Sequence, residues 1–461
     1  MTVVVSNRGP YRFVARSDGG FDTRLGAGGV ASSLGPLLTS GAAGADTSWI
    51  AAAVDDDDRR AAAAGAVEAP GVALTLLTIE ERRYRQYYDV ISNGVLWFLH
   101  HGLFDLPRRP RFDARFREAW ESYVTVNQDF ANAAVAVADG GDTVLVQDYH
   151  LALVPGMLTA ARPDLRIVHF THTPFCGPNS IRVLPDDIGR SICTSMASVP
   201  CGFHSERWAR AYAASAQQVL GTDAGASTFV ASLGPDLAAL AEVGESEAAR
   251  AAGIALNEML GDRSLLLRVD RVDPSKNIVR GFAAFDLALT DFPDLRDRVV
   301  FLARLNASRE TMPEYLGYRN EVEQAAAQVN DRWGTTNWQP VVLDTRDDFP
   351  STVAALARYD ALLVNPVRDG LNLVAKEGPL LNTRDGILCL SPEAGAFDEL
   401  GSAAIATHPF DLQQTAAAIH SALTMPGPER ATRAARLRSL ASARTPQDWL
   451  DDQVRAAGAA P

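Results

Sequence analysis

Short apolar runs alternate with segments of helical periodicity along the C-terminal half of the chain. Two helical segments, 277–289 and 315–331, place apolar residues at three- and four-residue spacing between the runs. The runs predicted as strands are SLLLRV (264–269), RVVFLARL (298–305), PVVLD (340–344), ALLVNP (361–366) and GILCLS (386–391). Continuous apolar strands separated by amphipathic helices are typical of βαβ units around a parallel sheet.

The N-terminal half shows the same pattern with longer loops. Strands are expected at 2–6, 143–147 and 166–172, and helices at 117–138 and 204–219. We place a domain boundary at Gly234–Pro235, which gives an N-terminal domain, 1–235, and a C-terminal domain, 236–461, whose last helix (about 428–460) is expected to cross back to the first. The pattern predicts two Rossmann-like, doubly wound α/β domains, with the ligand site where strand C-termini face a shared cleft.

Composition limits the classes of function. The 461 residues suit two domains, and 47% hydrophobic with 21% charged residues is typical of a globular protein. The net charge of -13 argues against nucleic-acid or anionic-membrane partners. We expect no membrane span, signal peptide or metal site, and a cytoplasmic location with free thiols. The cysteines that lack metal-ligand spacing are Cys176, Cys193, Cys201 and Cys389.

Lysine is almost absent from the chain. Of 43 basic residues only Lys276 and Lys376 are lysines. Arginine replaces lysine freely on a solvated surface but not where a compact ammonium is needed. The two lysines are therefore candidates for functional positions, although chance retention is the alternative.

The segment RVDPSKN (271–277) follows a predicted strand and precedes a helix. A turn at a strand's C-terminal end can direct Arg271 and Lys276 at one point. Such cations stabilise the charge that develops on a departing diphosphate. A solvated surface turn is the alternative interpretation.

The segment RDGLNLVAKEGPLLN (368–382) also joins a strand to a helix. Backbone N–H groups at such a helix start bind anions. Asp369 could accept sugar hydroxyls and Glu377 could reach a ribose, while an ordinary aspartate-capped helix is the alternative.

The N-terminal half offers weaker signals. The Gly-rich loop GAGGV (26–30) could approach a phosphate closely. Arg8, Asp148 and His172 each lie at the C-terminal end of a predicted strand, although a single histidine is more often structural.

Together these segments resemble the retaining glycosyltransferases of GT-B fold that make trehalose phosphate. The resemblance covers nearly the whole chain, from SNR at 6–8 to HPFD at 408–411. The motifs in family order are SNR, GGV, YYDVISNGVLW, QDYHL, HTPF, RVDPSKN, RDGLNLVAKE and LSPEAGAFDEL.

The resemblance implies roles for individual residues. The donor diphosphate would be held by Arg271, Lys276, Gly29 and the helix start at Asn372–Leu373, the transferred glucose by Asp369 and His172, and the ribose by Glu377. The acceptor glucose 6-phosphate would be held by Arg8, Tyr88, Trp97, Asp148 and Arg309. Two arginines suit a phosphate, and aromatic residues suit a sugar face. The family's reaction retains the anomeric configuration and implies no carboxylate nucleophile, cofactor or metal, because the nucleotide sugar is a substrate.

The chain departs from the family pattern at several positions. Gln147 replaces a usual His, Cys176 a usual Pro, and 274–277 (PSKN) a usual Tyr-Ser-Lys-Gly. The segment 342–352, where the family surrounds the nucleobase, is acidic. A carboxylate can accept both the ring N–H and the amino group of guanine. We therefore predict that Asp347 or Asp348 binds guanine and that the donor is GDP-glucose rather than UDP-glucose. Capping of a helix near Pro350 is the alternative.

Three functions compete on these grounds. The first is trehalose 6-phosphate synthesis. The second is a pseudo-glycosyltransferase coupling cyclitols, as in the related validoxylamine-phosphate synthase. The third is a non-catalytic sugar-phosphate sensor. The retained phosphate, glucose and acceptor residues favour the first. The sequence leaves open whether the chain forms a homo-oligomer.

Overall fold

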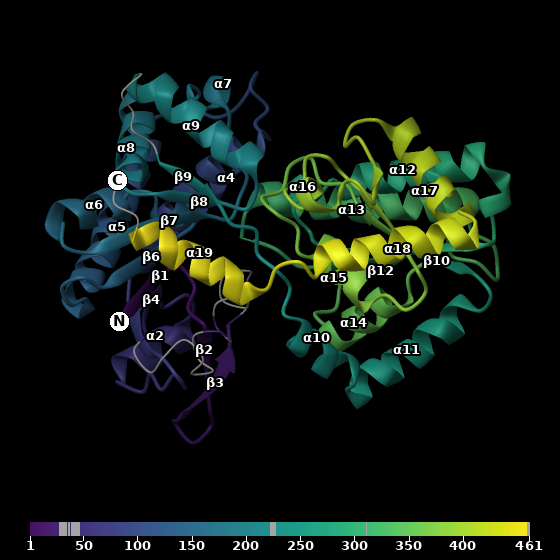
Figure 1. The fold of residues 1–461 in the computed structure, drawn as a ribbon, viewed down its shortest axis with the longest axis horizontal. Coiled ribbons are helices and arrows are strands. Elements are labelled where there is room, and N and C mark those ends of the chain that lie inside the picture. The colour runs from purple at the N-terminus through teal and green to yellow at the C-terminus, as the bar shows by residue number, and fades with distance from the viewer. Residues whose placement is uncertain (27–34, 36, 38–46, 222–226, 310, 459–461) are drawn as a thin grey trace. The chain divides into compact units, whose positions relative to one another are not determined.

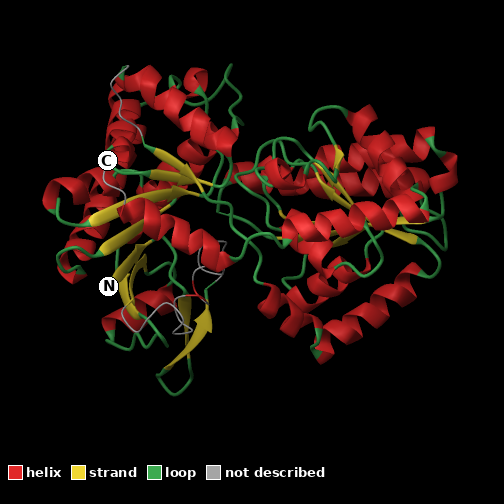
Figure 2. Ribbon diagram, viewed as in Figure 1, coloured by secondary structure: helices red, strands yellow, loops and turns green. Residues whose placement is uncertain are grey.

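The structure is a computed structural model that describes residues 1–26, 35, 37, 47–221, 227–309 and 311–458. The chain divides into two compact units. The first unit comprises Met1–Ser232 and Pro446–Pro461, and the second comprises Leu233–Thr445. The first unit thus ends three residues before the predicted boundary, and the chain returns to it at Pro446. Figure 1 shows the order of the elements, and Figure 2 shows helices lying around the strands of each unit.

The first unit is built on one parallel sheet. Its strand order, among the described residues, is β5-β4-β1-β6-β7-β8-β9. The strands are β1 (Thr2–Val5), β4 (Thr47–Ala52), β5 (Ala73–Leu77), β6 (Thr143–Gln147), β7 (Arg166–Thr171), β8 (Cys201–Phe203) and β9 (Thr228–Val230). The residues of β4 and β6 are all buried, as expected for parallel strands covered on both faces.

The other elements that the described residues of this unit form are an antiparallel hairpin and a set of helices. The hairpin is β2 (Tyr11–Ala15) with β3 (Phe21–Leu25). The helices are α2 (Asp56–Ala63), α3 (Glu81–Arg85), the π-helix η1 (Gln86–Leu96), α4 (Trp97–His101), α5 (Ala114–Val137), η2 (Tyr149–Leu151), α6 (Val154–Ala161), α7 (Pro178–Ile181), α8 (Asp186–Ala197), α9 (Glu206–Leu220) and α19 (Pro446–Gly458). Helix α19 packs against β6 and β7.

The second unit repeats the architecture with strand order β12-β11-β10-β13-β14-β15 in its described residues. The strands are β10 (Ser264–Arg271), β11 (Val299–Asn306), β12 (Val341–Asp344), β13 (Ala361–Val364), β14 (Ile387–Leu390) and β15 (Ile405–Ala406). The helices are α10 (Leu237–Gly244), α11 (Glu247–Leu260), η3 (Pro274–Lys276), α12 (Ile278–Asp291), η4 (Pro293–Leu295), α13 (Pro313–Trp333), α14 (Phe349–Arg358), α15 (Val374–Leu381), α16 (Phe397–Leu400), α17 (Leu412–Thr424) and α18 (Gly427–Ala441).

Both sheets confirm the predicted parallel α/β class. The order reverses between β1 and β6 in the first unit and between β10 and β13 in the second. Ligands of doubly wound sheets bind outside the strand C-termini at such a reversal. The segment predicted as one last helix is two, and only α19 belongs to the first unit. No described helix is long and apolar enough to cross a membrane.

Candidate functional site

Two cationic side chains follow the C-terminal end of β10, at the reversal point of the second sheet. Arg271 ends the strand, and Lys276 ends the 3₁₀ turn η3. The turn is fixed by Asn277, whose φ of 61° lies in the left-handed region. Glycine and asparagine tolerate this conformation best. This explains why Asn can replace the Gly that the trehalose-phosphate-forming glycosyltransferases usually have at this position. The Asn277 amide also donates to the carbonyls of Asn365 and Pro409, at 3.0 and 2.7 Å.

Lys276 is paired with Asp369, which follows β13. The Lys276 Nζ donates to Asp369 Oδ2, and the two side chains are 14% and 15% exposed. Asn372 Nδ2 donates to the same oxygen at 3.1 Å, and Asn372 Oδ1 accepts from the Ala375 N–H at the start of α15. Asn372 therefore joins Asp369 to the start of that helix. The structure thus brings together Lys276, Asp369 and Asn372, three of the residues that the sequence assigned to the donor's phosphates and glucose.

Buried carboxylates balance these cations. Burial raises the pKa of Asp270 to about 6, against the opposing effect of Arg268 and Lys276. Burial would also raise the pKa of Asp273, but Arg271 and Arg309 lower it to about 2. Asp273 is therefore ionised at neutral pH and holds both arginines, with Arg271 Nη2 at 2.9 Å and Arg309 Nη1 at 3.3 Å.

Arg309 contacts the same carboxylate as Arg271. It lies in the second unit, with a φ of 44°, and donates to the Tyr315 hydroxyl at 2.7 Å. The other residues assigned to the acceptor, Arg8, Tyr88, Trp97 and Asp148, all belong to the first unit. Within the second unit, Arg309 contacts Asp273 beside Arg271.

Glu377 lies in the first turn of α15. Burial raises the pKa of its carboxyl group to about 7. A carboxyl group with this pKa changes its hydrogen-bonding capacity near neutral pH, because only its ionised form accepts with both oxygens. Leu373, the residue before α15, precedes backbone N–H groups of a helix start, where an anion can bind.

Lys376, the second lysine that the sequence made a candidate for a functional position, is enclosed by the protein. Its side chain is fully buried, and Nζ lies 2.9 Å from both the Leu233 carbonyl and Glu399 Oε1. Burial lowers its pKa, and Glu399 opposes that effect. The compact ammonium fits this interior, but it is engaged within the protein. Lys376 is therefore structural.

The acidic segment at the end of β12 contains three aspartates that have different partners. Asp344 binds Arg304 at 2.9 Å and Arg346 at 2.7 Å. Asp348 caps α14 by accepting from the Ser351 N–H at 3.1 Å and the Ser351 hydroxyl at 2.5 Å. The capping interpretation therefore applies to Asp348. Asp347 is exposed and accepts from Asn306 Nδ2 at 3.2 Å.

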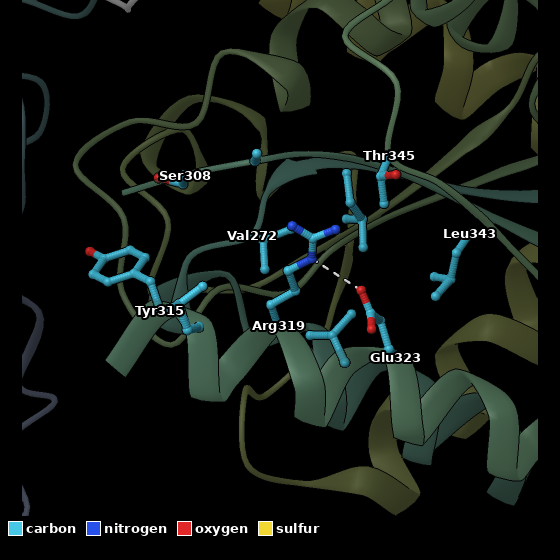
Figure 3. Close-up of a pocket in the computed structure, with 11 residues that line it drawn as sticks. Val272, Ser308, Tyr315, Arg319, Glu323, Leu343 and Thr345 are labelled. Carbon is cyan, nitrogen blue, oxygen red and sulfur yellow. Dashed lines mark hydrogen bonds and ion pairs between the residues drawn. The ribbon is translucent and has the colours of Figure 1, made fainter. Parts of the chain in front are cut away.

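A pocket of about 210 Å³ lies beside this segment, between the C-terminal ends of β10 to β12 and helix α13 (Figure 3). Val272, Leu305 and Leu343 form part of its apolar lining, and Ser308 and Thr345 contribute hydroxyls. On α13, Arg319 and Glu323 face each other at 3.0 Å. The pocket can take a small, flat and partly polar group.

A second cluster lies at the reversal point of the first sheet. Asp148 follows β6 with a φ of 71°, and its Oδ1 accepts from the His172 N–H at 3.2 Å. Its Oδ2 lies 3.8 Å from His150 Nδ1. The His150 ring stacks on Tyr88 at 5.5 Å, and Tyr88 stacks on Tyr84 at 5.4 Å. Asp148, Tyr88 and His172 therefore share one group of side chains.

Three other residues of this unit were assigned to the site from the sequence, namely Arg8, Trp97 and Gly29. Arg8 is exposed after β1, and its charge acts on Tyr84, the ring on which Tyr88 stacks. Trp97 is only 2% exposed and stacks on His101 at 4.2 Å, so its ring is part of the core. Gly29 lies outside the described residues.

His172 is held through both nitrogens of its ring. Nε2 lies 2.9 Å from Gln147 Oε1, and Nδ1 lies 3.2 Å from His204 Nε2. Burial, with a contribution from His169, lowers its pKa to about 3. His172 is therefore neutral at physiological pH and cannot act there as an acid.

Nearly the whole sequence of this chain matches one family of known proteins. A model of glycosyltransferase family 20 matches residues 1–458. The chain belongs to this family. Among family-20 relatives, it is 32% identical over 456 residues to a trehalose-6-phosphate synthase of Mycolicibacterium vanbaalenii, with 94% of this chain and 90% of that protein covered.

Two other relatives have names that specify a product or a substrate. An Arabidopsis thaliana protein named alpha,alpha-trehalose-phosphate synthase [UDP-forming] 1 is 30% identical, covering 98% of this chain and 49% of that protein. A Streptomyces hygroscopicus validamine 7-phosphate valienyltransferase is 30% identical, covering 83% of this chain and 78% of that protein. The chain spans about half the length of several curated relatives that it matches, including the Arabidopsis protein.

Solved structures confirm the GT-B class. A UDP-forming trehalose-phosphate synthase from Burkholderia vietnamiensis is 28% identical, with a TM-score of 0.83 and 99% of both chains covered. An Escherichia coli structure described as bound with UDP-2-fluoro glucose is 25% identical, with a TM-score of 0.84 and 100% and 99% covered. A Burkholderia xenovorans structure in complex with glucose-6-phosphate is 25% identical, with a TM-score of 0.83 and 100% of both chains covered.

Sequence reasoning missed residues that support the cluster of the first unit in this family-20 chain. Asn7 links Tyr84 and Tyr87 through its amide, at 3.2 and 3.0 Å. Asn93, in η1, binds the carbonyl of Tyr88 at 2.9 Å. Asn7 and Asn93 stand within the quoted SNR and YYDVISNGVLW motifs. Their roles depend on contacts between distant segments, which the motifs alone do not specify.

Proposed function

We propose that the chain transfers glucose from a nucleoside diphosphate glucose to glucose 6-phosphate, with retention of configuration, to form trehalose 6-phosphate. The observation that carries the proposal is the group of Arg271, Lys276 and Asp369 at the reversal point of the second sheet. The two cations would bind the diphosphate, and Asp369 would accept glucose hydroxyls. Two named activities among the relatives, trehalose-phosphate synthesis and valienyl transfer, fit a phosphorylated acceptor.

The chemistry requires stabilisation of a leaving group rather than a protein nucleophile. As the bond from glucose to the diphosphate breaks, negative charge grows on the phosphate oxygens. Lys276 and Arg271, already oriented by Asp369 and Asp273, would meet that charge without reorganisation. The acceptor hydroxyl attacks on the face that the nucleotide leaves, and the departing phosphate takes its proton. The acceptor itself would be bound by Arg8, Tyr88, Asp148 and Arg309.

A transfer assay with two acceptors tests this proposal against its main alternative. The protein is incubated with UDP-glucose or GDP-glucose and glucose 6-phosphate, and in parallel with a nucleotide-linked cyclitol and validamine 7-phosphate. Released nucleotide and coupled product are measured in both reactions. We expect a phosphorylated disaccharide from glucose 6-phosphate. Product only from validamine 7-phosphate with a nucleotide-linked cyclitol would instead support the pseudo-glycosyltransferase that the Streptomyces relative suggests. Binding of glucose 6-phosphate without turnover would support a sensor.

We further propose that Asp347 selects GDP-glucose over UDP-glucose. Support comes from its exposed carboxylate, since Asp344 is engaged by two arginines and Asp348 by the α14 cap. A carboxylate can accept from both the ring N–H and the amino group of guanine, whereas uracil offers one ring N–H. The adjacent pocket of about 210 Å³ gives the base a place. The names of several relatives specify UDP-forming enzymes, so this chain would differ from them.

Replacement of Asp347 by asparagine should reduce the preference for GDP-glucose. One good polar contact distinguishes substrates by about 1–3 kcal/mol, so we expect kcat/KM for GDP-glucose to fall at least about fivefold while that for UDP-glucose changes little. Asp344→Asn serves as the matched control. A wild-type protein that prefers UDP-glucose would reject this assignment.

Donor binding should depend on the ionisation of Glu377. Its folded-state pKa is raised from 4.5 to about 7, so the carboxylate that would accept ribose hydroxyls is lost as the pH falls through 7. We expect donor affinity to fall about tenfold from its high-pH plateau at pH 6. Calorimetric titration at several pH values measures this, and Glu377→Gln should remove the dependence. If the donor affinity of Glu377→Gln still falls with pH as in the wild type, another group, for example Asp270, causes the pH dependence.

A further inference from the structure

A chain of buried hydrogen bonds connects the last helix of the protein to His172. Gln453, on α19, accepts from Gln147 Nε2 at 2.9 Å. Gln147 Oε1 lies 2.9 Å from His172 Nε2, and His172 Nδ1 lies 3.2 Å from His204 Nε2. We call these four residues the Gln453–His204 chain. Its members come from β6, from the ends of β7 and β8, and from α19, which is more than 240 residues further along the sequence.

The direction of these bonds fixes the protonated nitrogen of His172. The Gln147 amide places its NH₂ group toward Gln453 and therefore its oxygen toward His172. An oxygen can only accept, so His172 Nε2 carries the proton and Nδ1 accepts from His204. Trp449, also on α19 and fully buried, packs edge-on to the His172 ring at 5.5 Å and limits its rotation.

The surroundings of Gln453 indicate that a contribution to stability does not by itself explain an amide side chain at this position. Gln453 is completely buried, yet within the described chain its Nε2 has no acceptor. An unpaired buried donor costs free energy that an apolar side chain would avoid. The Trp449 Nε1, on the same helix, is also unpaired among the described residues. The amide of Gln453 retains one clear task, which is to orient Gln147.

We propose that Gln453 is a positioning residue that acts through Gln147 to hold His172 as a neutral ring, protonated on Nε2, against the transferred sugar. This inference rests on the proposed function. Positive charge develops on the sugar ring as a glycosyl group leaves. A neutral, fixed imidazole can contact that ring without the repulsion that a charged or rotating one would add. The last helix thereby contributes to the reaction although it need not touch either substrate.

The other titratable groups around His172 fit this role. His169, in β7, is buried with its Nε2 3.2 Å from the Asp148 carbonyl. Asp148 faces His172 through the backbone N–H rather than the ring. Neither side chain therefore occupies a ring nitrogen of His172, and both of those nitrogens are filled by the Gln453–His204 chain.

The test compares three variants on the same helix. Gln453→Met keeps the shape of the side chain but removes its amide, Gln453→Glu keeps an acceptor for Gln147, and Gln447→Met is the control, since Gln447 donates to Asp451. We expect Gln453→Met to lower kcat about 10- to 100-fold with KM values within about threefold, because small misplacements in an active site have effects of this size. Its Tm should be unchanged or raised. Gln453→Glu should recover most of the lost kcat, and Gln447→Met should match the wild type.

Nitrogen NMR of the His172 ring supplies a measurement that does not depend on turnover. We expect the wild type to show a neutral ring protonated on Nε2 from pH 5 to 9, and Gln453→Met to lose this single form. If the wild type transfers no sugar, the proposed function fails while the ring measurement still decides the state of His172. Unchanged kcat and an unchanged ring spectrum in Gln453→Met would overturn the inference, as would a lower Tm with unchanged kcat.

Discussion

Lys276→Ala is expected to lower kcat by at least about 100-fold while the protein remains folded. Loss of one group that stabilises developing charge commonly costs about 10²–10³ in rate. The fold should survive because Asp369 still accepts from Asn372, and both side chains of the Lys276–Asp369 pair are partly exposed. Steady-state kinetics with a thermal melt measure the two effects separately.

The conservative variant Lys276→Arg sharpens this prediction. A guanidinium carries the same charge but is larger and planar, so it cannot occupy the ammonium position beside Asp369. We expect Lys276→Arg to have less than a tenth of the wild-type kcat. Activity within a few-fold of wild type in Lys276→Ala would mean that the donor diphosphate binds elsewhere.

Lys376→Met should have the opposite profile, with a large loss of stability and little effect on kcat. Removing the ammonium leaves Glu399 without its partner, and breaking a buried ion pair typically costs about 3–5 kcal/mol. Glu399 is 24% exposed, so we expect a loss near about 3 kcal/mol in urea unfolding. The double variant Lys376→Met/Glu399→Gln should recover part of that loss. A normal free energy of unfolding together with a collapsed kcat would instead return Lys376 to the donor site.

The strands around the reversal points were predictable because they are buried on both faces. The runs 265–267 and 361–364 are continuous apolar stretches, and the structure places β10 and β13 there. The β2–β3 hairpin was missed because Tyr11–Ala15 and Phe21–Leu25 are exposed or half-buried apart from one buried residue, Phe13. The π-helix Gln86–Leu96 was also missed, because its hydrogen-bond pattern produces no hydrophobic period in the sequence that distinguishes it from an α-helix.

The candidate site was predictable where neighbouring residues carry the chemistry. Arg271 and Lys276 share one turn, and Asp369 and Asn372 share another, so their motifs could be found directly. Lys376 contacts Glu399 and Leu233, His172 contacts Gln147 and His204, and Gln147 contacts Gln453. Those contacts join segments far apart in the chain, so spacing could not indicate them. Two lysines of similar sequence context therefore have different tasks.

The most direct test of the account is to follow glucose labelled with ¹³C at its anomeric carbon from UDP-glucose and GDP-glucose in the presence of glucose 6-phosphate. We predict that the label appears in α,α-linked trehalose 6-phosphate, with the α configuration of the donor retained and the faster transfer from GDP-glucose. Transfer of the label only to water, formation of a β-linked product, or no reaction with either donor would contradict the proposed function. Faster transfer from UDP-glucose would contradict only the assignment of Asp347.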